Sequence, residues 1–192
     1  ATRLATRFQR LPKVYTGRVR LGMETDTGDL DGKTVRESPV PPLESAQVQA
    51  AMDRYTGRLE IEPPAYSAVK YRGKPLYAWA RKGVSVPLQP RPCEVFAFRL
   101  TAWEPPEAAF RLECSHGTYA RSLAVLVGRS LGLPSVLSSL RRERVGPYSV
   151  DAASTLEALR GLGAEGIAKR LLPPAAPEPS GTAPAPPSAL CP

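Results

Sequence analysis

Several short stretches of the chain alternate between apolar and polar residues, which is the pattern of half-buried β-strands. The alternation is clear at residues 14–22, 94–103 and 109–115. A Glu-Pro-Pro interruption separates the second and third stretches, so they predict an antiparallel hairpin with a loose loop. A last strand is expected at residues 145–150. These stretches together predict a largely antiparallel sheet.

Other segments space their apolar residues three or four apart, as an amphipathic helix does. These segments are residues 1–10, about 43–55, 76–82 and 155–160. A further helix with a leucine-rich face is expected after Thr118. Thr118 and Ser154 carry hydroxyl side chains that cap helices, and each is predicted to be an N-cap. The mixture indicates an α+β fold, in which a mixed, largely antiparallel sheet has flanking helices.

An acidic stretch at residues 23–35 (METDTGDLDGKTV) ends in Asp-Gly between two strand-like runs, as hairpin turns often do. Its three aspartates also suggest a calcium loop. Placing Gly32 at the sixth position of such a loop puts Thr27 first and Ser38 twelfth, where Asp and Glu are required. The calcium interpretation is therefore rejected, and no metal site is expected.

Composition is that of a globular protein with one domain: 192 residues, 42% of them hydrophobic, and a mean hydropathy of −0.24. No apolar run reaches about eighteen residues, so no membrane span is expected, and no signal peptide is visible. Three widely spaced cysteines and a single histidine argue against a zinc site and favour reduced thiols in the cytoplasm. The Pro- and Ala-rich composition of residues 173–192 predicts a disordered tail.

The net charge of +8 and the pI of about 9.7 favour a polyanionic partner such as a nucleic acid, although a merely basic surface would carry the same charge. Residues 61–83 interleave three tyrosines and a tryptophan with Lys70 and four other cations. RNA surfaces use aromatic rings to stack on bases and cations to meet phosphates. Buried aromatic rings beside solvated lysine heads are the structural alternative.

The stretch from residue 110 to residue 144 carries the strongest candidate for a site. Its strand ends at a Gly-Thr break, and the start of the following helix presents Tyr119 and Arg121. Loops between rigid elements can aim side chains at a ligand. The alternative is that the glycine only makes the turn, Tyr119 belongs to the core and Arg121 is solvated.

Four blocks, in order and with matching spacing, resemble the tRNA pseudouridine synthases of the TruB type. The blocks are GRVRLG followed by TDT, PPAYSAVK, HGTYARSL and LRR. The resemblance covers about residues 1–172, which correspond to the downstream part of the catalytic domain. It implies an isomerase that flips uridine 55 out of the T arm of tRNA and converts it to pseudouridine without a cofactor or metal. It also implies a cytoplasmic monomer with tRNA as its partner.

The resemblance implies roles for single residues. Tyr15 corresponds to the tyrosine that stacks on the extruded base. Tyr119 corresponds to the tyrosine beside the nucleophile, and Arg121 to the arginine that pairs with the catalytic aspartate. Leu140 corresponds to a leucine of the uracil pocket. The residues expected to meet the RNA backbone are Lys70, Arg141, Arg142 and Arg144.

The sequence departs from the family in two places. The family's catalytic aspartate lies in a segment H-x-G-x-L-D-P-x-A-x-G, and these 192 residues contain no such segment. Many bacterial members also end in a PUA domain, a small RNA-binding barrel, where this chain has the Pro- and Ala-rich tail. The chain by itself is therefore expected to be inactive. The alternatives are a non-catalytic RNA-binding or tRNA-folding protein derived from the family, and a basic protein-interaction domain without an RNA role.

The four candidate site residues are expected to gather around one concavity, because strand ends can converge on one edge of a sheet. In this hypothesis Leu140 stands at the end of a loop, with the basic cluster that follows it on the rim. Arg121 is expected to be solvated or paired with a substitute acid, since an unpaired buried guanidinium is costly.

Overall fold

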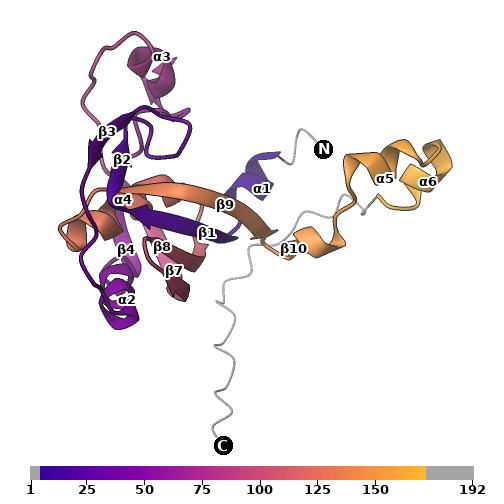
Figure 1. Ribbon diagram of the computed structural model, residues 1–192. Helices are drawn as coiled ribbons and strands as arrows, with labels where there is room; N and C mark the ends of the chain where they lie inside the picture. Colours follow the sequence, from indigo (N-terminus) through magenta and orange to yellow (C-terminus); the bar gives the residue numbers. More distant parts are fainter. Residues whose placement is uncertain (1–4, 172–192) are drawn as a thin grey trace, which may run out of the picture.

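A computed structural model describes residues 5–171 of the chain. Its centre is a six-stranded sheet in the order β10-β9-β1-β8-β7-β4, in which every neighbouring pair is antiparallel (Figure 1). The strands of this sheet are β1 (Lys13–Leu21), β4 (Gly57–Ile61), β7 (Arg91–Glu104), β8 (Glu107–Cys114), β9 (Ser135–Val145) and β10 (Tyr148–Ser149). The predicted tail at residues 173–192 lies outside the described residues.

Two short hairpins and several helices accompany the sheet. The hairpins pair β2 (Met23–Thr25) with β3 (Thr34–Glu37) and β5 (Lys70–Tyr71) with β6 (Lys74–Pro75). The helices are α1 (Ala5–Arg10), α2 (Ser45–Asp53), α3 (Leu76–Ala80), α4 (Ala120–Ser130), the 3-10 helix η2 (Val150–Ala152), α5 (Leu156–Arg160) and α6 (Ala164–Ala168). The predicted α+β class with a largely antiparallel sheet is confirmed.

The core lies between one face of the sheet and the helices α2 and α4. Val19 and Phe110 from the sheet and Leu123 and Val127 from α4 are all buried there. Phe98 packs edge to face on Phe110, with the ring centroids 5.3 Å apart. Burial of each such side chain contributes about 1.5–3 kcal/mol. This packing fixes the position of α4, and with it the start of that helix.

The predicted hairpin of two long strands is confirmed as β7 and β8, but its loop is tight rather than loose. Glu104 and Glu107 are register partners, so only two prolines connect the strands. The sequence pattern failed here because the prolines were taken to interrupt the pairing. They instead occupy the turn itself, where a residue without a backbone N–H removes no bond from the ladder.

The long strand β9 is the largest difference from the sequence prediction. The sequence prediction placed Leu140 at the end of a loop and a strand at 145–150, whereas β9 occupies Ser135–Val145 and the short strand β10 follows it. The run from Ser138 to Arg144 has little apolar alternation, so it gives no strand signal. Pairing with β1 along the whole length of β9 makes it a strand nevertheless. Leu140 therefore lies within a strand and not at the end of a loop.

Two predicted helix caps are wrong. Tyr119 is the N-cap residue of α4, and the Thr118 hydroxyl donates to the Ser115 carbonyl oxygen at 3.1 Å instead. Thr155, rather than Ser154, caps α5, where its hydroxyl accepts from the Ala158 N–H at 3.1 Å. In each case the neighbouring residue has the extended backbone that the cap position needs.

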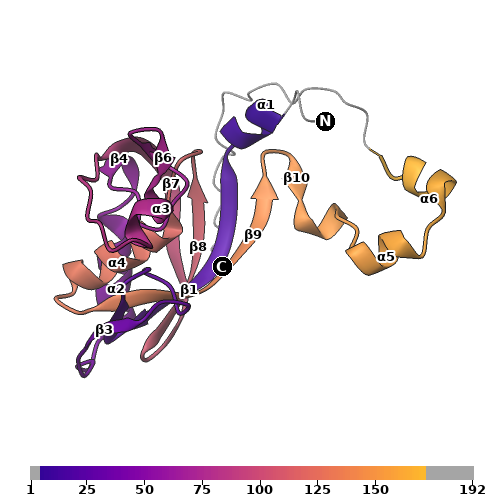
Figure 2. The same cartoon turned by 90° about the horizontal axis from the view of Figure 1, so that it is seen from above.

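The helices α5 and α6 extend away from the sheet beyond β10, as Figure 2 shows from above. Neither helix contains a buried residue. At the same end, α1 approaches β10, and the rings of Phe8 and Tyr148 lie 5.5 Å apart. No helix among residues 5–171 has the length and apolar character needed to cross a membrane.

Candidate active site

The first turn of α4 carries two of the predicted site residues. β8 ends at Cys114, and the chain turns through Gly117, whose φ of +82° lies in the left-handed region that favours glycine. Tyr119 follows with an extended backbone and a half-buried side chain, and Arg121 lies in the first turn. The Gly-Thr break predicted from the sequence is therefore a strand-to-helix turn that presents both residues.

Arg121 is held by three hydrogen bonds from its guanidinium. Nη1 donates to the Thr27 carbonyl oxygen at 3.0 Å and to Asp29 Oδ2 at 3.1 Å. Nη2 donates to the Tyr66 carbonyl oxygen at 2.7 Å. The Arg121 side chain is 23% exposed and that of Asp29 is 29% exposed, so the ion pair is partly shielded from water. Of the two expected states of Arg121, solvated or paired with a substitute acid, the structure shows the second.

The partner aspartate belongs to an acidic loop, residues 25–33, that is fixed by its own side chains. The Thr27 hydroxyl donates to Asp29 Oδ1 at 2.6 Å, and the Thr25 hydroxyl donates to the Asp29 carbonyl oxygen at 2.6 Å. Asp26 Oδ1 accepts from the Lys33 N–H at 2.8 Å. Both carboxylate oxygens of Asp29 are therefore engaged, which suits a counter-ion for Arg121 rather than a nucleophile.

The acidic loop also joins α4 to β9. The Leu137 N–H donates to the Gly28 carbonyl oxygen at 3.0 Å, and Asp29 forms an isolated bridge with Leu137. A Cβ atom built on Gly28 would lie 3.9 Å from Arg121 Cβ, so the loop passes directly over the start of α4. Leu140 follows Leu137 by three residues. The loop thus contacts both Arg121 and the part of β9 three residues before Leu140.

Tyr15 and Leu140 lie on neighbouring strands and on the same face. Gly17 of β1 is the register partner of Leu140, and Tyr15 is the partner of Arg142. A Cβ atom on Gly17 would lie 2.5 Å from the Ser139 carbonyl oxygen and 2.7 Å from Phe110 Cζ, so only glycine allows this approach. Tyr15 packs against the core, whereas Leu140 is 45% exposed. Both side chains therefore lie on the face of the sheet that carries the core.

The Tyr15 hydroxyl is kept in its neutral form. Burial raises its pKa, Cys114 acts in the same direction, and the Arg142 guanidinium opposes both. Burial likewise raises the pKa of the Cys114 thiol to about 11, although the nearby Thr118 hydroxyl and Lys13 charge oppose the shift. A neutral phenol and an inert thiol can form the wall of a base pocket, but neither is suited to act as a base near neutral pH.

The three arginines of β9 do not form one continuous patch. Successive strand residues point to opposite faces, so Arg142 shares the face of Tyr15 and Arg141 does not. Arg141 pairs with Glu143 at 3.3 Å, and the Thr16 hydroxyl donates to the same carboxylate at 2.7 Å. Arg144 is exposed, as are Arg141 and Arg142. Their expected role at the RNA backbone stays a prediction.

Lys70 is exposed on a separate substructure, the basic hairpin, which comprises residues 62–84. This segment contains five Lys and Arg residues and one acidic residue, Glu62. Cations lie over aromatic rings at three places: Arg72 over Tyr71 at 5.4 Å, Lys74 over Trp79 at 5.7 Å and Arg81 over Tyr77 at 5.3 Å. Figure 1 shows α3, which belongs to this hairpin, standing apart from the six-stranded sheet.

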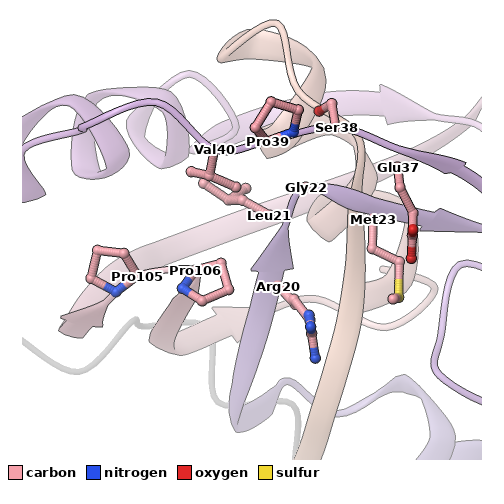
Figure 3. A pocket seen from close by; sticks show the side chains of 10 residues that line it. All are labelled: Arg20, Leu21, Gly22, Met23, Glu37, Ser38, Pro39, Val40, Pro105 and Pro106. Atoms are coloured by element: carbon pink, nitrogen blue, oxygen red, sulfur yellow. The ribbon is translucent and has the colours of Figure 1, made fainter.

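A groove of about 620 Å³ opens at the far end of β1, and Figure 3 shows its lining. Leu21, Gly22 and Met23 line one side, and the Pro105-Pro106 turn lines another. None of the predicted site residues lies in it. Among residues 5–171, no group of three or more His, Cys, Asp and Glu side chains could hold a metal ion.

Comparison with known proteins shows the family of this chain. Residues 1–120, more than half of the chain, match the model of the TruB family pseudouridylate synthase (N terminal domain). The chain belongs to the TruB family. The resemblance seen in the four sequence blocks is thereby confirmed.

Curated relatives agree with this membership. The tRNA pseudouridine synthase B of Aromatoleum aromaticum is 42% identical over 173 residues, which cover 88% of this chain and 56% of that protein. The tRNA pseudouridine synthase B of Opitutus terrae is 40% identical over 173 residues, which cover 90% of this chain and 72% of that protein. The Xanthomonas campestris protein of the same name is 42% identical over 178 residues, 92% of this chain and 58% of its own length. The chain therefore spans little more than half the length of two of these three TruB relatives.

Solved structures share the TruB fold. A chain in the crystal structure of a Cbf5-Nop10-Gar1 complex aligns with a TM-score of 0.63 at 24% identity, covering 90% of this chain and 45% of that chain. A chain in the structure of an H/ACA RNP bound to a substrate RNA containing 2′-deoxyuridine aligns with a TM-score of 0.55 at 22% identity, covering 82% and 36%. At such low identity these likenesses establish the fold alone.

Sequence reasoning missed the part that the acidic loop plays in the site. The stretch was interpreted as a hairpin turn, and it does join β2 to β3. Three aspartates and two threonines are more polar groups than a simple turn needs, and this excess was the available signal. Asp29 sits 92 residues before Arg121 in the chain, so only the folded structure shows that the two pair.

Proposed function

We propose that this chain is the larger, downstream part of the catalytic domain of a tRNA pseudouridine synthase that acts on uridine 55 in the T arm. The observation that carries the proposal is the 40–42% identity with proteins named tRNA pseudouridine synthase B over most of the chain. Residues 1–172 form the catalytic part in this proposal, and the tail has no catalytic role. The protein acts as a cytoplasmic monomer without metal or cofactor.

The reaction is an isomerisation, so atoms balance within the nucleotide. The bond from the sugar C1′ to the uracil N1 breaks, the uracil rotates, and C1′ bonds to C5. The proton on C5 leaves to solvent, and N1 gains a proton. A carboxylate must act directly at the sugar or the base, and the base must first leave its stack.

Arg121 supplies the geometry for orienting such a carboxylate. A guanidinium has five N–H donors, and the three bonds to the acidic loop and the basic hairpin use three of them. Among residues 5–171, no hydrogen bond engages the remaining two. Two donors on one guanidinium can hold a second carboxylate in a bidentate pair. Asp29 holds Nη1 of Arg121, and Tyr119 lies at the start of α4, the helix that carries Arg121.

The walls of the base pocket come from Tyr15 and Leu140. A neutral phenol ring can stack on the extruded uracil, and the 45% exposed leucine offers an apolar contact. Lys70 and its hairpin bring positive charge and partly exposed rings for the T arm, and Arg142 adds charge on the Tyr15 face. The basic net charge supports RNA as the partner.

The test measures tritium release from a T-arm stem-loop labelled at C5 of uridine. The 192-residue chain alone is expected to release none, because its sequence lacks the family's aspartate segment. A chimera that carries the aspartate segment of the Aromatoleum aromaticum relative ahead of residue 1 is expected to release tritium. Tight binding of the stem-loop by a chimera that releases no tritium would favour the non-catalytic RNA-binding alternative. Failure to bind at low salt would favour the protein-interaction alternative.

A further inference from the structure

The basic hairpin is folded mainly on itself. The Leu76 N–H donates to the Val69 carbonyl oxygen at 2.7 Å, and the Tyr77 N–H donates to the Ser67 carbonyl oxygen at 3.1 Å. The rings of Tyr71 and Trp79 meet edge to face at 6.1 Å. The hairpin therefore has hydrogen bonds and ring packing of its own.

Only two hydrogen bonds within residues 5–171 connect the basic hairpin to other parts of the molecule. Arg121 Nη2 donates to the Tyr66 carbonyl oxygen at 2.7 Å, and the Ser122 hydroxyl donates to the Glu62 carbonyl oxygen at 2.8 Å. Both donors are side chains of the first turn of α4. Pro63, which follows Glu62 at the root of the hairpin (residues 62–67), is fully buried.

We infer that Ser122 is a positioning residue. Its hydrogen bond to the Glu62 carbonyl oxygen, here called the latch, holds the root of the basic hairpin to α4 and thereby couples the position of that hairpin to the orientation of Arg121. The inference rests on the proposed function for its consequence, but the latch itself does not need RNA. Within residues 5–171, the Ser122 side chain forms no hydrogen bond to Asp29, Tyr15 or Leu140. Its effect on the reaction passes through Arg121 and the hairpin.

The coupling follows from the three bonds of Arg121. Two of them go to the acidic loop, which is fixed internally, and the third goes to Tyr66 at the root of the hairpin. If the root moves by about an ångström, the bond to Tyr66 is lost because hydrogen bonds weaken steeply with distance and angle. Ser122 holds the same root one residue along the helix. The latch therefore helps to keep Nη2 bonded to Tyr66 while Nη1 stays bonded to the acidic loop.

The first experiment follows amide hydrogen exchange in the 192-residue chain without RNA. Ser122→Ala is expected to speed exchange about fivefold in peptides covering residues 62–84, the size expected for one lost hydrogen bond. Ser122→Thr, which keeps a hydroxyl, should remain near the parent rate. The matched control is Ser67→Ala at the same root, because the buried Ser67 hydroxyl has no hydrogen-bond partner among residues 5–171. Peptides from β1 and β8 should not change in any variant.

Two results would overturn the latch. One is a Ser122→Ala profile that matches the Ser67→Ala profile. The other is faster exchange throughout the sheet as well as in the hairpin, which would mean a general loss of stability. Neither result depends on RNA binding, so this experiment stands even if the proposed function fails.

The second experiment titrates a fluorescent T-arm stem-loop RNA at several salt concentrations. Ser122→Ala is expected to weaken binding about threefold to fivefold without changing the slope of log Kd against log salt, because no phosphate contact is lost. Ser122→Thr should restore the parent affinity. An unchanged affinity of Ser122→Ala, despite faster exchange in the hairpin, would overturn the coupling to RNA. Absence of binding by the parent chain would overturn the proposed function. The latch would then be decided by the hydrogen-exchange experiment alone.

Discussion

The acidic loop and the basic hairpin meet at one guanidinium, yet they are built in opposite ways. The acidic loop is fixed by its own threonines and aspartates and by the Leu137 N–H from β9. The basic hairpin has internal order but only two hydrogen bonds to the body within the described residues. Arg121 therefore has a fixed side, the acidic loop, and a weakly tethered side, the basic hairpin. In the proposed function, the fixed side sets the position of Arg121, and the weakly tethered side carries the positive charge that meets the RNA.

The largest effect is expected from removing the shared anchor. Arg121→Ala leaves Asp29 without its cation and takes the donor from Tyr66, so unfolding should become easier by roughly 1–3 kcal/mol. Tritium release by the chimera should fall at least 100-fold, since the second carboxylate loses its orienting group. Urea unfolding and the tritium assay measure the two effects. Arg129→Ala, an exposed arginine of the same helix, is the control. Equal losses in both variants would contradict the role of Arg121.

The next effect tests the fixed side alone. Asp29→Asn removes the negative charge but keeps the shape, and it should cost about 1–2 kcal/mol of unfolding free energy because the Arg121 charge loses its counter-ion. Asp31→Asn removes the same charge from an exposed position of the same loop and should change stability by less than about 0.5 kcal/mol. Chemical denaturation of the two variants measures the difference. A loss in Asp31→Asn as large as that in Asp29→Asn would show that loop charge, and not the ion pair, stabilises the fold.

The third effect tests the weakly tethered side, the basic hairpin. Lys70→Ala should weaken stem-loop binding a few-fold and reduce the salt slope by about one, which is the signature of one lost phosphate contact. Thermal stability should not change, because Lys70 is exposed. Lys33→Ala removes an exposed lysine from the acidic loop and is the matched control. If the two variants lower the affinity and the slope equally, the charge of the hairpin has no special place in binding.

The last comparison concerns the interior of the hairpin, where a small effect on global stability is expected. Trp79 donates its indole N–H to the Tyr71 carbonyl oxygen at 3.2 Å, and Trp103 donates to the Leu43 carbonyl oxygen at 2.8 Å. Trp79→Phe should loosen only the hairpin, with almost no change in Tm, whereas Trp103→Phe should lower Tm by several degrees. Scanning calorimetry measures the Tm of the two variants. An equal fall in Tm would mean that the hairpin folds as one unit with the sheet.

Local patterns predicted most of the elements that have a regular apolar period. The alternation at residues 14–22 became β1, the paired stretches around the two prolines became β7 and β8, and the leucine-rich face became α4. In each case the buried side chains recur at the spacing of the element, every second residue in a strand and every three to four residues in a helix. Position along the chain alone also brought Tyr119 and Arg121 to the start of one helix.

The sequence by itself determined the family, the fold class and the residues at the start of α4, because motifs and periodicity are local properties. Only the tertiary structure decided that residues 135–145 are a strand, since pairing with β1 makes a strand of a polar run that has little apolar alternation. It likewise decided that Arg121 pairs with Asp29 and reaches Tyr66. These partners lie 92 and 55 residues away along the chain, and no local pattern can encode which distant carboxylate or carbonyl will face a given guanidinium. That choice is made by the packing that brings β9, α4 and two loops together.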